Sequence, residues 1–364
     1  MNQITKRKVV RNIILNQRFL QLKYISMAID HTLDKIRKED RYSHSIEVAN
    51  CCEIMNDSIS EKLGVITDYK NTAYIVGLLH DLGHTAGGHE GERALNKMSR
   101  KYSHGKISFD GNSNNYVVIE KSNMLEGVSL SDQEYILASL AKHPELLYID
   151  QKHIKEYIEK SVKADKVFFT ENGISSSKMN KTIQCQIMDI ADENCYIVSD
   201  IIDSRNILTT KELSRIFRKE FPRKVSQKLI NSLYSSKSTF VSVMQEYFFL
   251  FSENFTFIEG VLVPENKEIE EIRQTFAKIN RKYVLSSKKI KEVRTRNKLI
   301  INEVFNFFFK KENIEKIPSR FYKNEIKKAS SRKERIRLTR DMLGSLTDKG
   351  IKKLYYKEIK NGNN

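Results

Sequence analysis

The sequence predicts an all-α protein. Apolar residues recur every three to four positions along most of the 364-residue chain, which is the spacing of one helix face. Only 4 prolines and 14 glycines interrupt this pattern. Strand-like alternation is scarce, and VFFTENG at 167–173 is the best candidate for a short extended piece. Long loops are expected near 103–115, where GNSNN at 111–115 is a loop signal, and near 170–180.

The clearest helices lie in the first 210 residues. Their predicted apolar faces are formed by Val48, Cys52 and Met55, by Ile75, Leu78 and Leu79, and by Ile183, Ile187, Ile190 and Ala191.

Three regions are expected along the chain. Residues 1–37 form a helical N-terminal extension and residues 38–210 a central core. Residues 211–364 form a helical C-terminal region that completes the fold. Within DMLGSLTDKGIKKLYYKEI near the C-terminus, the residues predicted to pack on the core are Met342, Leu343, Leu346, Ile351 and Leu354.

Positive charge is concentrated in the C-terminal region. The formal net charge is +17, and residues 281–364 hold 25 basic and 9 acidic residues, a net charge of +16. A basic face of this kind can bind DNA or a polyphosphate ligand, or it can be solvated surface. No RGG stretch, zinc finger or RNA-binding aromatic motif decides between these alternatives.

The chain is expected to be cytoplasmic. No apolar run reaches the length of a membrane span, and no signal peptide is evident at the N-terminus. The four cysteines lack CxxC spacing, so we expect reduced thiols.

Histidine and aspartate occur together at a helix end. YIVGLLHDLGH at 74–84 is an apolar helix that ends in His80 and Asp81, just before Gly83. His44 lies near the start of an earlier helix. Buried His and Asp are costly unless their polar atoms are satisfied, and a divalent metal ion would satisfy both.

A third patch supplies further carboxylates. Asp192, Tyr196 and Asp200 recur every four residues and share one helix face. Asp189, one turn before Asp192, is the main rival ligand. Two histidines and two aspartates make a mixed N/O set, which suits Mn²⁺, Mg²⁺, Fe²⁺, Co²⁺ or Zn²⁺. The residue types do not choose among these ions, and Mn²⁺ or Mg²⁺ is the expected cofactor.

In this ordered series the chain resembles the HD-domain phosphohydrolases and, within them, the dGTPase-like deoxynucleoside triphosphate triphosphohydrolases. The superfamily pattern H…HD…D is carried by His44, His80, Asp81 and Asp192. The richer family patterns, which cover about residues 38–356, are RxxHSxEV at 41–48, HDxGHxxxGHxGE at 80–92, FxGN at 109–112, KxP at 142–144, ADxxxY…D…D at 191–203 and the TD-containing segment at 341–355.

The resemblance implies an activity and a set of roles. The activity is metal-dependent hydrolysis of a dNTP to a deoxynucleoside and inorganic triphosphate, in a homo-oligomer whose catalytic core is residues 38–210. The implied metal ligands are His44, His80, Asp81 and Asp192; the implied catalytic residues are His84, His89 and Glu92; the implied substrate-binding residues are Arg41, Asn112, Tyr196 and Asp200.

The chain also departs from the family. Thr85, Ala86 and Gly87 replace the proline and phenylalanine usual between the histidines, which predicts a more flexible loop. Asn114 stands where glutamine is usual. The family's FRRLxxKTQ segment is not recognisable, so base specificity is not carried over.

Two other functions stay open on the sequence alone. One is an HD-domain phosphohydrolase that acts on a nucleoside monophosphate or a signalling nucleotide. The other is a nucleic-acid-binding regulatory protein whose HD site is structural. The four intact ligand residues favour an enzyme, and the basic C-terminal region keeps DNA binding in view.

Overall fold

The computed structural model describes residues 1–25 and 40–361 and confirms the all-α class. Within those residues, regular structure is helical except for one two-stranded antiparallel sheet. The predicted N-terminal extension is helical as far as residue 24, and residues 26–37 lie outside the described residues.

The first half of the chain, up to the long central helix α9, contains α1 (Gln3–Leu15), α2 (Gln17–Gln21), η1 (Leu22–Tyr24), α3 (Arg41–Leu63), α4 (Ala73–Leu79), α5 (Gly88–Tyr102), α6 (Gly111–Ser122), α7 (Leu130–Ser139), η2 (Pro144–Leu146), η3 (Ile149–Gln151), α8 (Lys152–Glu171) and α9 (Ile183–Ser204).

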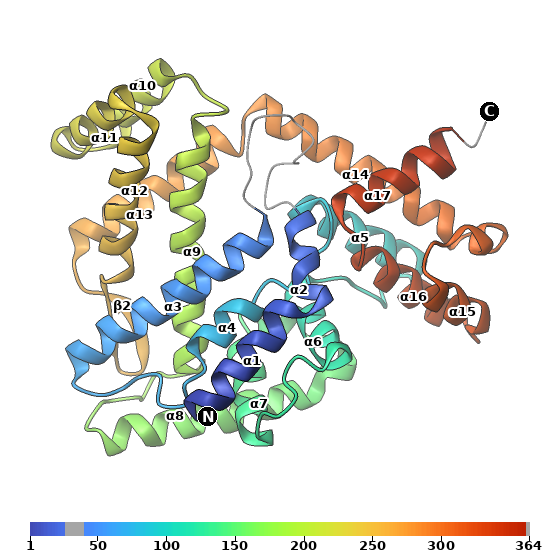
Figure 1. The fold of residues 1–364 in the computed structure, drawn as a ribbon, viewed down its shortest axis with the longest axis horizontal. Helices are drawn as coiled ribbons and strands as arrows, with labels where there is room; N and C mark the ends of the chain where they lie inside the picture. The colour runs from blue at the N-terminus through green and yellow to red at the C-terminus, as the bar shows by residue number, and fades with distance from the viewer. Residues whose placement is uncertain (26–39, 362–364) are drawn as a thin grey trace.

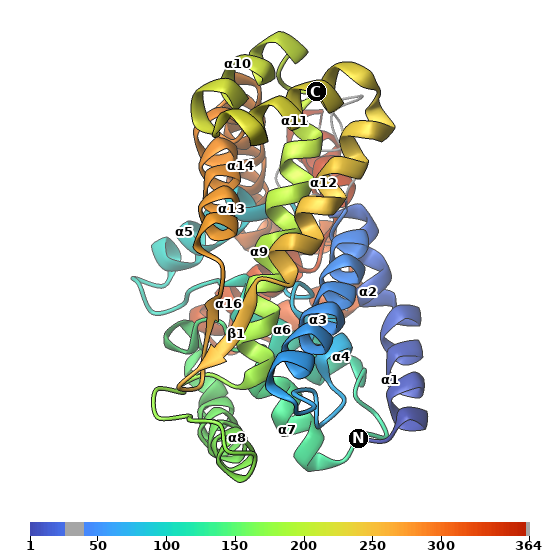
Figure 2. The same cartoon turned by 90° about the vertical axis from the view of Figure 1, so that its left-hand side faces the viewer.

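The second half contains α10 (Thr210–Glu220), α11 (Arg223–Ser235), α12 (Lys237–Ser252), β1 (Phe255–Ile258), β2 (Val261–Pro264), α13 (Lys267–Ile279), the π-helix η4 (Asn280–Val284), α14 (Lys288–Phe309), η5 (Lys311–Lys316), α15 (Arg320–Lys328), α16 (Arg332–Gly344), α17 (Asp348–Leu354) and η6 (Tyr355–Lys360). Helices α10–α13 lie on one side of α3 and α9, and α14–α17 lie on the other (Figures 1 and 2).

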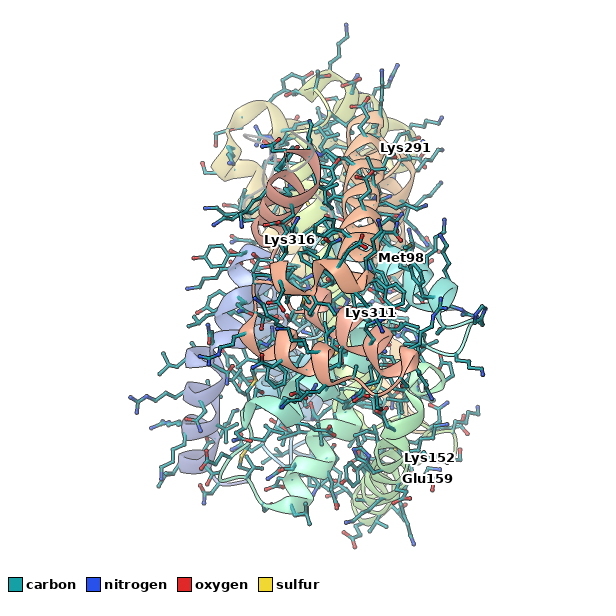
Figure 3. The ribbon with its side chains drawn as sticks, turned by 90° about the vertical axis from the view of Figure 1, so that its right-hand side faces the viewer. Met98, Lys152, Glu159, Lys291, Lys311 and Lys316 are labelled. Carbon is teal, nitrogen blue, oxygen red and sulfur yellow. The ribbon has the colours of Figure 1, made fainter. Side chains whose placement is uncertain are left out.

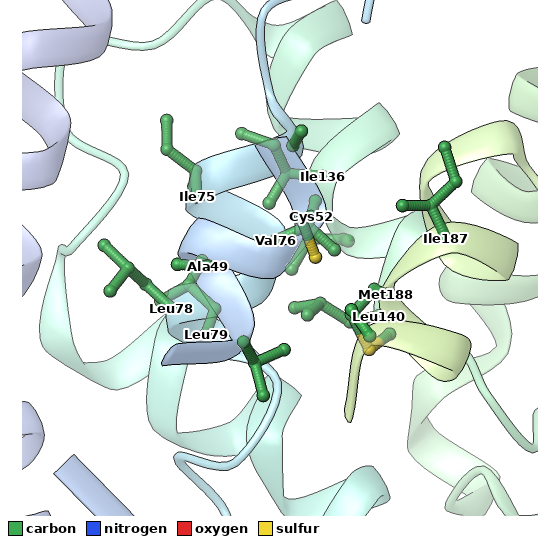
Figure 4. Close-up of a cluster of buried hydrophobic side chains, with 14 of the residues drawn as sticks. Ala49, Cys52, Ile75, Val76, Leu78, Leu79, Ile136, Leu140, Ile187 and Met188 are labelled. Carbon is green, nitrogen blue, oxygen red and sulfur yellow. The ribbon is translucent and has the colours of Figure 1, made fainter. Parts of the chain in front are cut away.

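The centre of the fold is the packing of α4 against α3 and α9. Figure 4 shows their buried side chains, among them Cys52, Val76 and Met188, meeting in one apolar cluster. Helix α4 approaches α3 so closely that a Cβ on Gly77 would lie 2.5 Å from the Cα of Ala49. Only glycine allows this approach, and it fixes the end of α4 relative to the start of α3.

A second apolar cluster joins the C-terminal helices to α5. Leu95 of α5 packs with Phe305 of α14 and Leu343 of α16. The prediction that the C-terminal segment packs on a core is confirmed: Leu346 is partly buried, and the fully buried members are Met342, Leu343, Ile351 and Leu354.

Two local expectations were wrong. The segment 167–173 is not extended, because α8 continues to Glu171. Phe169 is fully buried on the inner face of α8 and Phe168 stacks on Tyr69 at 4.2 Å, so the apolar run extends the helical face. Helix packing has overridden the strand propensity of these residues.

The segment 111–115 is not a loop but the start of α6. The side chain of Asp110 accepts a hydrogen bond from the Ser113 amide at 2.8 Å and so caps the helix. Asn115 is buried, and its amide group bonds Gly83 N and the His80 carbonyl oxygen, both at 2.5 Å. These polar residues are helical because they satisfy backbone groups of the neighbouring loop.

The β-hairpin was not expected. Strands β1 and β2 pair around Glu259 and Gly260, whose φ angles are +52° and +80°. Two positive φ values suit the tight hairpin turn, and aromatic and β-branched residues flank it. The hairpin lies between α12 and α13. Its signal in the sequence is FTFI–EG–VLVP, in which two apolar runs flank Glu259 and Gly260.

Three further features complete the description. No helix formed by residues 1–25 and 40–361 combines the length and apolarity needed to cross a membrane. All four cysteines are free thiols and buried. Lysines project from the C-terminal region, and Figure 3 shows Lys291 on α14 with Lys311 and Lys316 on η5.

Candidate metal centre

Three helices bring two histidines and an aspartate together. Asp40 caps α3 by accepting the Ser43 amide at 2.8 Å, which places His44 in the first turn. His80 follows the last residue of α4, and Asp192 lies midway along α9. Their ligand atoms all lie within 4.8 Å of one another. Asp192 Oδ1 is 2.8 Å from His44 Nε2 and 3.5 Å from His80 Nε2.

The side chains of this group fit a divalent metal ion. His80 Nδ1 donates to the Gly77 carbonyl oxygen at 2.7 Å, which leaves the lone pair on Nε2. That Nε2 is buried and has no hydrogen-bond partner among residues 1–25 and 40–361. Asp81 Oδ1 lies 3.6 Å from it and can complete a mixed N/O set. This donor set suits the cations expected from the sequence.

Each aspartate is also held by a buried cation. The Arg41 guanidinium bonds Asp81 Oδ2, and the Lys142 ammonium bonds Asp192 Oδ2. Each carboxylate therefore turns its Oδ1 toward the histidines. Burial alone would raise the pKa of both aspartates. Instead, Arg41 and nearby histidines lower the pKa of Asp81, and Lys142 and His80 lower that of Asp192, both well below the usual range.

The same charges act on the cationic side chains. Burial would lower the pKa of His80, but the carboxylates of Asp81 and Asp192 raise it above its ordinary value. Burial would also lower the pKa of Lys142, and Asp192 and Asp189 raise it. Both aspartates are therefore ionised, and Lys142 is a fixed positive charge.

A second group lies beside the first. Glu92 Oε2 is 3.9 Å from His84 Nε2 and 3.7 Å from His89 Nδ1, and Glu92 Oε1 accepts the Gly111 amide at 3.0 Å. His84 Nδ1 is 3.3 Å from Asp81 Oδ1, which connects the two groups. Burial and the charge of Arg41 lower the pKa of His84, so its imidazole is neutral near pH 7.

A cavity of about 440 Å³ opens beside the centre. Tyr196, Asp200, Asp192 and His89 are among its lining residues. The Tyr196 ring stands edge-on to His44, with ring centroids 6.0 Å apart. The four-residue spacing on α9 therefore places Tyr196 and Asp200 in one cavity with Asp192.

Two residues named from the sequence do not take the places expected of them. Asn112 is in the first turn of α6 and does not line this cavity. Asp189 bonds Lys181 Nζ at 3.3 Å, its side chain is 41% exposed, and it does not belong to the His44–His80–Asp192 group. Asp189 still lines the cavity, and its Oδ1 lies 3.8 Å from Lys142 Nζ. The rival ligand therefore pairs with two lysines and lies outside the group of ligand atoms.

Sequence reasoning missed three residues that the structure places here. Lys142 belongs to the KxP motif, but its burial beside Asp192 depends on tertiary packing, and the sequence alone does not show it. Asp348 belongs to the TD segment near the C-terminus and bonds the loop before α5. Arg281 lines the cavity from η4, and no local pattern in the sequence marks it.

Comparison with known proteins agrees with this geometry. The family profile described as HD domain matches residues 41–194, and the profile described as phosphohydrolase-associated domain matches residues 265–357.

Three similar proteins are each named deoxyguanosinetriphosphate triphosphohydrolase-like protein. The protein of Rickettsia akari (strain Hartford) is 31% identical over 200 residues, which cover 53% of this chain and 44% of that protein. That of Rickettsia prowazekii (strain Madrid E) is 30% identical over 198 residues, 53% of this chain and 45% of the relative. The match therefore spans less than half the length of these relatives. That of Neorickettsia sennetsu (strain ATCC VR-367 / Miyayama) is 24% identical over 368 residues, 92% of this chain and 86% of the relative.

His44, His80, Asp81 and Asp192 all lie inside the segment that the HD profile matches. The phosphohydrolase-associated profile matches C-terminal helices that pack against α5. The chain therefore carries an HD domain followed by a phosphohydrolase-associated domain, and it is similar over most of its length to a deoxyguanosinetriphosphate triphosphohydrolase-like protein.

Proposed function

We propose that this chain is a metal-dependent triphosphohydrolase that converts a deoxynucleoside triphosphate to a deoxynucleoside and inorganic triphosphate. The observation that carries the proposal is the convergence of His44, His80 and Asp192 within 4.8 Å, with Asp81 beside them. These four residues would hold the metal ion. When bound, the ion would supply a water activated for attack on the α-phosphorus and would stabilise charge on the phosphates.

The neighbouring group is suited to proton transfer. His84 is neutral and buried, so it can accept or donate a proton beside the reacting phosphate. His89 is 56% exposed at the cavity, where it can reach the departing oxygen of the deoxynucleoside. Glu92, anchored by the Gly111 amide, would orient both histidines.

Binding of the substrate would use the remaining side chains. Arg41 bonds Asp81 through Nη1, while its Nε and Nη2 are buried, find no hydrogen-bond partner in the described part of the chain, and can donate to a phosphate oxygen. Tyr196 and Asp200 line the cavity where the sugar would lie. An aromatic ring packed on the sugar would exclude a 2′-hydroxyl and favour deoxynucleotides. On this proposal, residues 38–210 supply the catalytic core and residues 211–364 complete the fold.

Product analysis tests the proposal. The purified protein is incubated with each of the four dNTPs and with Mn²⁺ or Mg²⁺, and the products are separated by ion-exchange chromatography. The expected products are a deoxynucleoside and intact triphosphate, and Asp192→Ala should form neither. Release of orthophosphate from a nucleoside monophosphate, with dNTPs left intact, would assign the site to another nucleotide. No turnover of any nucleotide would indicate a structural site.

A further inference from the structure

The loop between α4 and α5 sets the position of the second histidine group. Thr85 and Ala86 are buried, and Gly87 and Gly88 have φ angles of +78° and +56°. This left-handed backbone turns the chain directly into α5, which carries His89 in its first turn. Any shift of the loop therefore moves His89 relative to His84.

The C-terminal helices hold this loop from outside the matched HD segment. Ile301 of α14 lies 3.2 Å from the point where a Cβ on Gly87 would stand. The Asp348 carboxylate, in the first turn of α17, accepts the Gly87 amide at 2.7 Å. The gap between the loop and these helices measures about 10 Å³, the lower limit for one water molecule. The contact is closely packed and joins residues 261 positions apart.

We propose that Asp348 is a positioning residue of the reaction, which acts by fixing the loop that carries His84 and His89. The hydrogen bond from the Gly87 amide to Asp348 Oδ1 restrains the backbone of the Thr85–Gly87 segment, and it depends on the position of that oxygen. The predicted flexibility of Thr85–Gly87 is thus opposed by a contact from α17. The inference rests on the proposed function, because it assigns the loop histidines to proton transfer.

A purely structural role predicts a different behaviour. An acidic residue in the first turn of α17 also stabilises that helix through its negative charge. For that role the charge matters and the position of one oxygen does not. The two roles are separated by Asp348→Asn, which keeps the acceptor oxygen without the charge, and Asp348→Glu, which keeps the charge but displaces the oxygen.

The experiment measures kcat, KM and bound metal for both variants. We expect Asp348→Asn to keep kcat within about threefold of wild type and Asp348→Glu to lose roughly tenfold or more. Bound metal and KM should stay near wild-type values in both. Glu334→Ala is the matched control, because Glu334 lies in the first turn of α16 and accepts the Ser330 amide away from the centre. The reverse order, with Asp348→Glu active and Asp348→Asn impaired, would overturn the proposal.

Hydrogen exchange tests the restraint of the loop by Asp348 without relying on activity. The amides of residues 84–91 should exchange at least about tenfold faster in Asp348→Glu than in wild type, and at near wild-type rates in Asp348→Asn. Equal exchange rates for these amides in all three proteins would refute the restraint of the loop by Asp348. If wild type turns over no dNTP but this exchange pattern holds, the proposed function fails while the positioning of the loop stands.

Discussion

The two aspartates of the centre each divide their oxygens between a buried cation and the histidines. Because Arg41 and Lys142 occupy one oxygen apiece, the other oxygen is aimed at His44 and His80 before any metal ion binds. The centre is therefore arranged by fixed ion pairs. Breaking one of these pairs would leave a buried charge uncompensated, which is strongly unfavourable.

The first prediction concerns the proposed metal ligands. His80→Ala, Asp81→Ala and Asp192→Ala should each remove bound metal and activity while far-UV circular dichroism still reports a helical protein, since each variant deletes one donor of a small set. Metal is measured by atomic emission after gel filtration. Asp189→Ala is the control and should keep its metal. Wild-type turnover in any of the three variants would remove that residue from the ligand set.

Proton transfer makes the second prediction. His84→Ala and Glu92→Ala should each lower turnover by roughly 10²- to 10⁴-fold, the usual range for a lost general acid or base, with metal still bound. Single-turnover kinetics and metal content are measured together. If both variants lose the metal ion, the His84–His89–Glu92 group coordinates metal and does not transfer protons.

At this scale the sequence predicted which residues meet but not what surrounds them. The order of His44, His80 and Asp192 placed them on helices that do converge. The partners of Asp81 and Asp192 depend on tertiary packing, since Lys142 lies 50 positions from Asp192. Asn112 shows the reverse case, in which a motif residue does not line the cavity.

Among the elements, α8 and α9 are joined by a buried carboxylate. Asp165 of α8 is fully buried and accepts hydrogen bonds from Tyr69 at 2.7 Å and Tyr135 at 3.1 Å. It also accepts the amide of Ile183, the first residue of α9, at 2.7 Å. The carboxylate thus fixes the start of the helix that carries Asp192.

The pKa of this carboxylate gives a third prediction. Burial raises the pKa of Asp165 from 3.8 to about 6, so between these pH values the folded protein binds more protons than the unfolded chain. The free energy of unfolding should therefore fall as pH rises from about 4 to about 6, by on the order of 2–3 kcal/mol from this group. The free energy of unfolding is measured by urea titration at several pH values. In Asp165→Asn it should lack this contribution to its decrease with pH. Exposed Asp57 supplies the control Asp57→Asn, and equal slopes for wild type and Asp165→Asn would contradict the assignment.

Element types were more predictable than element boundaries. Helical spacing identified α3, α4 and α9 because their apolar faces are continuous. The start of α6 was missed because Asn and Ser are typical loop residues, and here they bond the backbone of a neighbouring loop that only the folded chain provides. The VFF run of α8 was ambiguous in the same way, since β-branched and aromatic residues suit both a strand and a buried helix face.

At the scale of the whole molecule, the C-terminal region packs on the core and carries most of the excess positive charge. Deleting residues 341–364 should destabilise the entire protein, because it removes the buried Met342, Leu343 and Ile351 from the cluster under α5. Losing several such side chains costs more than about 5 kcal/mol, comparable to the total stability of a domain. Thermal unfolding measures the effect, with a chain shortened only by residues 361–364 as the control. A stable, active protein that ends at residue 340 would contradict this.

The basic surface makes the last prediction. Lys327 and Lys328 are exposed on α15, so Lys327→Gln with Lys328→Gln should leave the melting temperature unchanged. If this face binds DNA, the double variant should bind more weakly and its affinity should depend less on salt, by about one unit of slope per lost phosphate contact. Fluorescence anisotropy with a labelled oligonucleotide measures both, and Lys160→Gln on α8 is the control. If the wild-type protein binds no DNA at low salt, the basic surface is not a DNA-binding site.

The bond between Gly87 and Asp348 also has a consequence for biosynthesis. A ribosome makes the HD segment first, and α3, α4 and α9 can pack once about 200 residues have emerged. The loop that carries His84 and His89 meets its acceptor only 261 residues after Gly87 has been made. On the proposal for Asp348, a nascent chain can therefore assemble its metal ligands long before its proton-transfer residues are held in place. Catalytic competence would then arrive late in translation, after the helices of the C-terminal region have folded onto α5.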